Sequence, residues 1–580
     1  SQEFSCTYVT IQPLVSIFNE SRMSYPFRSI NNIDINEDIK NESLDYHGIT
    51  AGFINKLKLV ERIDARLPIS KKHGAILSHG QRVKAMIICG LGFTQNPIYL
   101  SHHFFENKAL AVLFGKGVKH EHFNDDALGR TLDAIYAYGV TELFAEIANE
   151  IAQEFMPATK RQILHLDTTS LKLSGDYDVN AECEEDKNQP PRPMHGHSKD
   201  HRPDLKQVVL SLTVTGPANL PLWIEGLNGN SQDKTNFHQT LARIEQFRAA
   251  LEKSPDILVI ADSALYVHDK LINTFYTWLT RVPESVKVAK QLVISEDEIF
   301  SWQTLGNGYK GAWLGQEDRG MRQHWGLIYS EQANKRETIT LNRRIEKAQL
   351  TAEKEARKLK SEPFTCEKDA QRAAIAFEKK LKYHKVDYQL IPIKKFTGRG
   401  RPKAGEQPSI VHYELHITLE PCEEKQRPSR NKLGRFILST NDLNNEDMDL
   451  ATLLASYKEQ QGVERGFRFI KDPQFHLNSI FLKKPERINA LMMIMTLCLM
   501  VYNTGEYEIR ETLKSENQTV LNQVGKATRK PTMRWLFQRM NGINVLTFRG
   551  KGACITGLSE EKKKILRLFG PEIATLYNVV

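Results

Sequence analysis

YKEQQGVERGFRFIK, at residues 457–471, is the most informative stretch of this sequence. Leucines at helical spacing precede it, so the stretch is expected to continue a helix. Because seven residues return a helix to within about 20° of its starting direction, Tyr457, Glu464 and Lys471 would share one face. A hydroxyl, a carboxylate and an ammonium in one line suit a site that holds a metal ion and phosphates. The alternative is an ordinary solvated helix face.

Two glycines weaken this predicted helix. Gly462 and Gly466 each cost about 1 kcal/mol relative to alanine in a helix interior. We therefore expect close packing, or the close approach of a ligand, at both positions. The helix is predicted to begin at Asn445-Glu446-Asp447 and to end near Pro473.

The composition is that of an ordinary globular protein with a mild basic excess. The 580 residues carry a formal charge of +9, which permits nucleic acid as a partner without identifying one. Seven cysteines are scattered without a C-x-x-C pair, which favours a reducing cytoplasm over a disulfide framework. The longest apolar run, Ile488 to Tyr502, is about 15 residues long. It is too short to span a bilayer comfortably and is predicted to be a buried helix, with no membrane partner.

The first half of the chain changes from helical to strand-like patterns. Residues 1–158 are predicted to form a helical N-terminal domain, either a plain scaffold or a DNA-binding module. Residues 159–283 follow as the first part of an α/β core. Its predicted strands are 162–171, 207–214, 222–226, 257–262 and 276–282, of which the first three suggest a meander and the fourth is buried.

In the second half of the chain, regular patterns return after a heterogeneous block. Residues 284–430 hold strand-like pieces around a charged stretch, 336–382, that is predicted to be a solvated helical hairpin. Residues 431–510 supply the second part of the core. Residues 511–580 form a basic C-terminal region that we expect to serve in dimerisation or DNA contact.

Three acidic residues stand out by position. Asp167 lies on an alternating strand, Asp262 at the end of the buried strand and Glu464 on the late helix. Buried charges are costly unless they are paired or bind a metal. Carboxylates in this number suit hard divalent ions such as Mg²⁺, which serve phosphodiester chemistry. Any long chain offers similar triplets, so the spacing alone is a weak signal.

Several phrases of the sequence resemble the IS4-type DDE transposases, especially their IS1634 branch. The first is the Tyr-x2-Gln-x3-Glu-x6-Lys pattern from Tyr457 to Lys471; the others are Leu166 to Ser170, Gly196 to Gln207, Thr280 to Pro283 and Val463 to Phe469. The resemblance covers roughly residues 45 to 510. It implies an α/β (α+β) fold with an RNase H-like catalytic core, a large inserted domain and a preceding helical domain. The gap of about 200 residues between Asp262 and Glu464 fits such an insertion.

The resemblance also assigns roles to single residues. It makes Asp167, Asp262 and Glu464 the catalytic, metal-binding triad, and it places Tyr457 and Lys471 against DNA phosphates. The family usually has arginine where this chain has Gln460, which can donate to a phosphate but brings no charge. We expect Arg465 or Arg468 to compensate.

Further DNA contacts are predicted outside the late helix. Residues 398–403 resemble an AT-hook, whose Arg399, Arg401 and Lys403 would enter a narrow minor groove; the alternative is a flexible basic turn. Lys199 and Arg202 are expected to contact DNA from a polar loop. That loop also holds Cys183 and the histidines at 195, 197 and 201, but their spacing matches no usual zinc pattern.

Three tryptophans of the inserted block are open to two interpretations. In related transposases an insertion-domain tryptophan stacks on a flipped base at the element's end. Trp302, Trp313 and Trp325 are the candidates here. Each is individually more typical of a buried core residue.

The sequence therefore predicts a DNA transposase of a bacterial insertion sequence. It would bind terminal inverted repeats and target DNA as a homodimer, and would cleave and join strands with Mg²⁺, for which Mn²⁺ would substitute. A cytoplasmic, nucleoid-associated location follows from that interpretation. The alternatives are a catalytically silent DNA-binding repressor derived from a transposase, and a stand-alone RNase H-like nuclease.

Overall fold

The computed structural model describes most of the chain. The described residues are 39–69, 76–92, 101–155, 161–173, 175, 177, 189–196, 202–231, 233–251, 256–274, 276–318, 320–396, 405, 407–443, 448–472, 482–549 and 552–578. At the centre lies a nine-stranded mixed sheet. Its strands, from one edge to the other, are β4 (Leu220–Leu227), β3 (Lys206–Thr215), β2 (Arg161–Leu173), β5 (Asp256–Ala261), β6 (Thr277–Arg281), β12 (Arg435–Thr440), β9 (Met321–Ser330), β8 (Tyr309–Asp318) and β7 (Gln303–Gly306).

The sheet combines two kinds of pairing. β2, β3 and β4 pair antiparallel in sequence order, which confirms the predicted meander. β5 then pairs parallel to β2, and β6 parallel to β5. Every β5 residue after Asp256 is buried, as its continuous apolar run predicts. Beyond β6 the strands β12, β9, β8 and β7 are antiparallel neighbours, so β7–β9 of the insertion extend the same sheet.

Helices cover both faces of the sheet. One face packs against α10 (Asp233–Ala249) and α12 (Lys287–Ile294), around a core that includes Phe237, Trp278 and Trp325. The other face packs against α16 (Leu450–Glu459) and α17 (Gln461–Ile470). Smaller elements connect the strands on these faces: η5 (Ser263–Leu265), α11 (His268–Leu271) and η6 (Asp297–Ile299).

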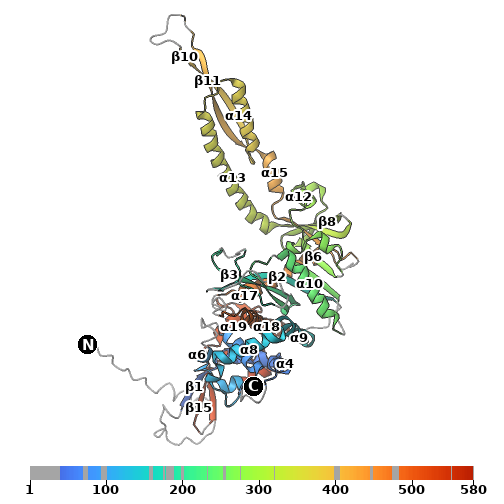
Figure 1. The fold of residues 1–580 in the computed structure, drawn as a ribbon, viewed down its shortest axis with the longest axis vertical. Coiled ribbons are helices and arrows are strands. Elements are labelled where there is room, and N and C mark those ends of the chain that lie inside the picture. Colours follow the sequence, from blue (N-terminus) through green and yellow to red (C-terminus); the bar gives the residue numbers. More distant parts are fainter. Residues whose placement is uncertain are drawn as a thin grey trace, which may run out of the picture.

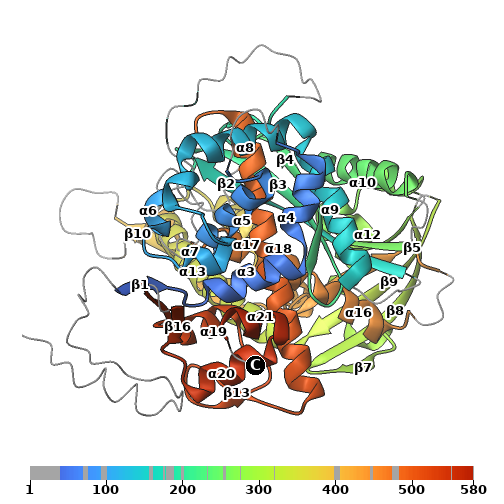
Figure 2. The same cartoon turned by 90° about the horizontal axis from the view of Figure 1, so that it is seen from below.

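The two ends of the described chain share one hydrophobic core (Figures 1 and 2). The predicted run 488–502 lies in α18 (Pro485–Ser515), which contacts helices of the early part. It is the one described helix long and apolar enough to cross a membrane, and 83% of its apolar window is buried. The early elements are β1 (Ile39–Ser43), α3 (His47–Lys56), α4 (Leu59–Arg66), α5 (His79–Gly90), α6 (Ser101–Phe105), α7 (Leu110–Phe114), η4 (His120–Phe123), α8 (Asp125–Tyr138) and α9 (Val140–Phe155).

The late elements close over the early ones. β1 pairs with β15, and the Tyr577 hydroxyl both accepts from the Ile49 backbone N–H at 3.0 Å and donates to the Asp45 carbonyl at 2.6 Å. Gly48 permits this contact, because a Cβ there would lie 2.7 Å from the Tyr577 ring. The late elements are β13 (Val520–Leu521), β14 (Ala527–Thr528), α19 (Met533–Arg539), β15 (Asn544–Phe548), β16 (Gly552–Thr556), α20 (Glu560–Leu568) and α21 (Pro571–Leu576).

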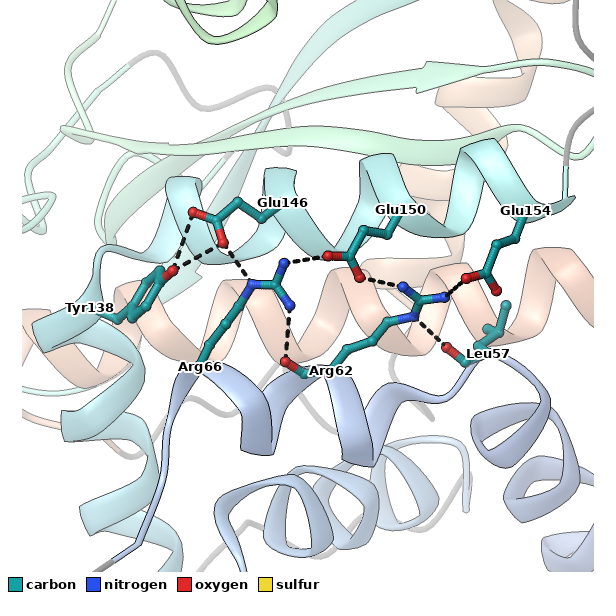
Figure 3. Close-up of polar contacts among 7 residues, drawn as sticks. All are labelled: Leu57, Arg62, Arg66, Tyr138, Glu146, Glu150 and Glu154. Atoms are coloured by element: carbon teal, nitrogen blue, oxygen red, sulfur yellow. Dashed lines mark hydrogen bonds and ion pairs between the residues drawn. The ribbon is translucent and has the colours of Figure 1, made fainter. Parts of the chain in front are cut away.

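A ladder of ion pairs joins α4 to α9 (Figure 3). Arg66 contacts Glu146 and Glu150, each at 2.6 Å. Arg62 contacts Glu150 and also Glu154, the latter at 2.6 Å. The three glutamates recur every four residues and so lie along one side of α9. We call these five residues the α4–α9 ladder.

The insertion also forms a long arm that projects away from the sheet (Figure 1). The described residues of the arm are 331–396, 405 and 407–431. Its helices α13 (Glu331–Ser361) and α14 (Glu367–Lys380) pack against a two-stranded ribbon of β10 (His384–Lys395) and β11 (Ser409–Pro421), and α15 (Glu423–Asn431) returns to β12. The largely exposed α13 and α14 confirm the predicted solvated helical hairpin. The cysteines of the described part, at 89, 366, 422, 498 and 554, are free.

Candidate active site

The stretch 450–471 forms two helices instead of the single helix expected. Gln460 ends α16 and begins α17, and its backbone N–H bonds to the Tyr457 carbonyl, three residues back. Such i to i−3 bonds tighten a helix and change its direction. Asp449 caps α16 by accepting from the Thr452 backbone N–H at 2.7 Å. The predicted start at 445–447 and Pro473 lie outside the described residues.

The two glycines of α17 are required by close packing. A Cβ on Gly462 would lie 1.6 Å from the Asn219 side-chain oxygen, so the Asn219 side chain would have to move to accept it. A Cβ on Gly466 would lie 3.0 Å from Leu499 of α18. The packing expected at both positions is confirmed, and it fixes α17 against β2, β3 and α18.

Asp167 and Asp262 lie side by side on neighbouring strands. β2 and β5 are parallel and in register up to Leu166 and Ala261, so the next residue on each is one of the two aspartates. Neighbouring strands are about 4.8 Å apart. Leu166 and Ala261 belong to the core under α10, and alternation therefore turns both aspartates toward the face covered by α16 and α17. The Asp167 carboxylate accepts from the Thr168 N–H at 2.7 Å, and that of Asp262 from the Ala264 N–H at 2.9 Å.

Tyr457 is the group that senses all three predicted carboxylates. Burial raises the pKa of its phenol to about 12; Arg281 opposes that rise, and the negative charges of Asp262, Glu464 and Asp167 add to it. The charges of all three carboxylates thus act on one protonated phenol near the α16–α17 junction. Within the described ranges, however, no three His, Cys, Asp or Glu side chains gather closely enough to hold a metal ion.

The structure adds two features that the sequence did not single out. Arg281 follows Thr280, the partner of Ala261, so it occupies the register position beside Asp262 on β6. Its guanidinium lies 5.3 Å from the centre of the Phe436 ring. His165, two residues before Asp167 on the same face of β2, lies 3.8 Å from the Glu459 carboxylate. A charged residue at the end of an apolar strand was the available signal for Arg281.

The predicted DNA-binding residues of α17 differ in exposure. Glu464, Arg465 and Arg468 are exposed, whereas Lys471 is half-buried at the C-terminal cap of the helix. Gln460 is 7% exposed, and within the described part of the chain its side-chain oxygen has no hydrogen-bond partner. The position where the family pattern expects an arginine is thus a buried amide at the helix junction.

The predicted contacts outside α17 are less well placed by the structure. The Arg202 guanidinium forms a bidentate ion pair with the Asp204 carboxylate, with hydrogen bonds of 2.8 and 2.7 Å. Lys199 and the AT-hook-like residues Arg399, Arg401 and Lys403 lie outside the described residues, as do three of the four zinc candidates, Cys183, His197 and His201. The fourth, His195, contacts the Pro203 carbonyl at 3.2 Å.

The three tryptophans separate by burial. Trp325 is fully buried in the core under α10, which confirms that it is a core residue. Trp302 is half-buried, with the Lys310 ammonium 4.3 Å from its ring centre. Trp313, on β8, is 37% exposed and is the one of the three that presents a large aromatic surface to solvent.

The donor set suits a hard divalent cation in its chemistry. Two carboxylates on neighbouring parallel chain segments and a third on the covering helix are oxygen ligands of the type that Mg²⁺ takes. A protonated phenol and a guanidinium can donate to phosphate oxygens. The residue types, rather than their present spacing, are therefore those that hold a phosphodiester beside a metal ion.

Comparisons with known proteins agree with this chemistry. Residues 158–501 match the family described as a transposase DDE domain, and residues 39–149 match a domain of unknown function (DUF4277). No curated protein matches the chain. Among solved structures, a piggyBac transposase synaptic complex with hairpin DNA aligns over 87% of this chain and 82% of the piggyBac chain, with 8% sequence identity. The TM-score of 0.34 is too low to identify a shared fold.

Proposed function

Because the chain belongs to the transposase DDE domain family, we propose that it is a DNA transposase of the IS4 type, from the IS1634 branch. It would bind the terminal inverted repeats of an insertion sequence, cut the DNA at the element's ends and join the freed ends to target DNA. The observation that carries the proposal is that Asp167 and Asp262 each follow the last register pair of β2 and β5, Leu166 and Ala261. The helix of Glu464 packs against β2.

The topology supports an RNase H-like core for this function. Three antiparallel strands followed by two parallel ones, in the order β4-β3-β2-β5-β6, place both aspartates at one end of the sheet. We propose residues 159–283 and 431–510 as the two parts of this core, and residues 284–430 as the insertion. Residues 1–158 and 511–580 would be the flanking helical and C-terminal regions, with DNA contact or dimerisation as their roles.

Asp167, Asp262 and Glu464 are the residues that would hold Mg²⁺, or Mn²⁺ in its place. A bound divalent ion supplies an activated water or 3′-hydroxyl and stabilises the leaving oxygen. The chain's own residues position the DNA. Tyr457 keeps its proton at physiological pH and so donates a hydrogen bond to a phosphate oxygen, while Arg281 neutralises charge beside Asp262.

The DNA would reach this site along the exposed face of α17. Arg465 and Arg468 extend into solvent and would contact the backbone near the cut bond, with Lys471 beyond them and Gln460 beneath them. Trp313 is the candidate that would stack on an unpaired base. Arg202 would have to leave Asp204 to bind a phosphate. Paired ends require a homodimer, and a cytoplasmic, nucleoid-associated location fits such a partner.

The test is metal-dependent cleavage of a duplex carrying the element's end. Wild-type protein should cut it with Mg²⁺ or Mn²⁺, and Glu464→Gln, which keeps the size of the side chain and removes its charge, should not. Glu511→Gln, on an exposed part of α18, is the matched control and should cut normally. Equal cutting by wild type and Glu464→Gln would refute the assignment.

The same assay separates the alternatives. Binding without cutting under any divalent ion would favour a silent repressor. Cutting without end specificity, and without joining of the cut strand to target DNA, would favour a stand-alone nuclease.

A further inference from the structure

The arm carries almost all of the excess positive charge of the chain. Residues 331–431 hold 23 Lys and Arg against 15 Asp and Glu, so they account for eight of the nine net charges. This charge lies in the insertion between Asp262 and Glu464, and the mechanism above does not use it. It therefore requires an explanation of its own.

Five of these cations form a line on α13. They are Arg336, Arg343, Lys347, Lys354 and Lys358, and all five are exposed. At about 100° per residue they fall within roughly 40° of Arg336 around the helix. The buried side chains of α13, Leu341, Ala352 and Ala356, fall on the opposite side, against the ribbon. We call the five cations the α13 stripe; it faces directly away from the rest of the arm.

The α13 stripe is segregated from the acidic residues of the same helix. Acidic residues at 331, 337, 346, 353, 355 and 362 all fall roughly 80° or more from Arg336. Of the four α13 cations outside the stripe, two form ion pairs: Lys335 with Glu331 at 2.6 Å, and Arg357 with Glu353 at 3.9 Å. Among the described residues no ion pair is found for any of the five. Two like-charge pairs four residues apart, Arg343–Lys347 and Lys354–Lys358, even weaken the helix.

The spacing of the α13 stripe matches duplex DNA. From Arg336 to Lys358 the helix rises about 33 Å, close to the roughly 34 Å of one turn of B-DNA. The phosphates along one turn of DNA would supply negative charges over the same length as the stripe, and they would relieve the repulsion between its cations. α13 begins at the end of β9, which shares a sheet with Asp167 and Asp262. A duplex beyond the cut bond is therefore the fitting occupant.

We propose that the α13 stripe binds the phosphate backbone of the terminal duplex, away from the bond that is cut. This inference rests on the proposed function for the identity of the DNA. The stripe lengthens the DNA footprint of the protein by about one helical turn. It contributes affinity that is independent of sequence and sensitive to salt.

The experiment measures DNA affinity as a function of salt. Fluorescence anisotropy compares an end duplex of about 40 base pairs with one of about 15, from 50 to 300 mM NaCl. The test variant is Arg343→Ala/Lys347→Ala/Lys354→Ala, since alanine keeps the helix. The control is Lys368→Ala/Lys379→Ala/Lys380→Ala on α14, which removes the same charge from exposed positions elsewhere on the arm. Circular dichroism checks that both variants fold.

The stripe variant should lose at least about 10-fold in affinity for the long duplex at 200 mM salt, and its log–log salt slope should fall by about 2.7. Its affinity for the short duplex, and its metal-dependent cutting of that duplex, should change less than about 2-fold. An unchanged slope on the long duplex, or an equal loss in the α14 control, would overturn the proposal. Failure of wild-type protein to cut would instead refute the transposase function, while the slopes would still decide whether the stripe binds DNA.

Discussion

The glutamates of the α4–α9 ladder and the cations of the α13 stripe are both rows of like charges at helical spacing, yet the two rows have opposite surroundings. The glutamates of α9 lie every four residues and meet two arginines of a neighbouring helix. The cations of α13 lie at spacings of seven and four, and no described carboxylate pairs with them. The first row has its counter-charge inside the molecule and holds it together. The second leaves its counter-charge to a ligand.

Asp167 and Asp262, on the neighbouring segments of β2 and β5, are a third case. Their charges act on the Tyr457 phenol, and the Arg281 guanidinium opposes them there. A row of acids that is only partly neutralised suits a cation from outside the chain. The comparison thus separates charged residues that stabilise the fold from charged residues that bind a ligand. Substitutions at each kind of position test this distinction.

The largest expected effect is on catalysis at the sheet. Asp262→Asn should reduce cutting of an end duplex by more than about 100-fold, because even residues one contact removed from a metal typically cost 10- to 100-fold. Glu150→Gln in the ladder removes the same charge and should leave cutting per folded molecule unchanged. Single-turnover gel assays at saturating Mg²⁺ measure both. A large catalytic loss in Glu150→Gln would remove the distinction between the two kinds of row.

The next effect is on stability. Arg62→Ala should lower the free energy of unfolding by about 2 kcal/mol, since it removes a buried guanidinium that contacts Glu150 and Glu154 and donates to the Leu57 carbonyl. Glu150 keeps its contact with Arg66. Arg343→Ala in the stripe should change it by less than about 0.5 kcal/mol, because an exposed, unpaired side chain holds nothing in place. Urea unfolding followed by circular dichroism compares the two. Similar losses in both variants would contradict the comparison.

The stability contributed by the ladder should depend on acid. Arg62 holds the pKa of Glu154 below its ordinary value of 4.5. A lowered carboxyl pKa in the folded state adds stability that is complete above the unfolded pKa and is lost as the pH falls through the folded one. The difference in unfolding midpoint between wild type and Arg62→Ala should therefore be constant from pH 6 to 8 and narrow below about pH 4.5. A difference that stays constant down to pH 3 would show that packing, not charge, is its source.

The smallest expected effect is on the rate of cutting when the Tyr457 hydroxyl is removed. Tyr138 donates to Glu146 in the ladder, whereas Tyr457 lies among three carboxylates. Tyr457→Phe should slow cutting by roughly 10-fold, the loss expected for one hydrogen bond to a charged group. With a phenol pKa of about 12, the variant and wild type should share one pH profile up to pH 10. A step in the wild-type profile that the variant lacks would show that the phenol ionises during the reaction.

Local patterns were sufficient to predict much of the sheet. Alternation identifies β2, and an unbroken apolar run identifies β5, because both patterns depend on burial of the strand itself. Asp167 is predicted on the alternating strand and Asp262 at the end of the buried one, and both lie there. The solvated nature of α13 also follows from its sparse apolar residues.

The remaining features depend on contacts that no local pattern contains. The break at Gln460 arises where α16 packs on the middle of the sheet and α17 packs on β2 and β3. The inclusion of β7–β9 in the central sheet depends on β12, which pairs with β6 on one side and β9 on the other. Arg281 joins the site only through the parallel register of β5 and β6.

The bonds of Tyr577 to the backbone at residues 45 and 49 set an order of events during synthesis. A polypeptide emerges from the ribosome in sequence order, so the early helices leave the exit tunnel more than 500 residues before their partner exists. Until then their apolar sides have no permanent cover and are exposed to chaperones or to other nascent chains. The part of the molecule that is made early is thus completed late, and truncations near residue 577 should leave it prone to aggregation.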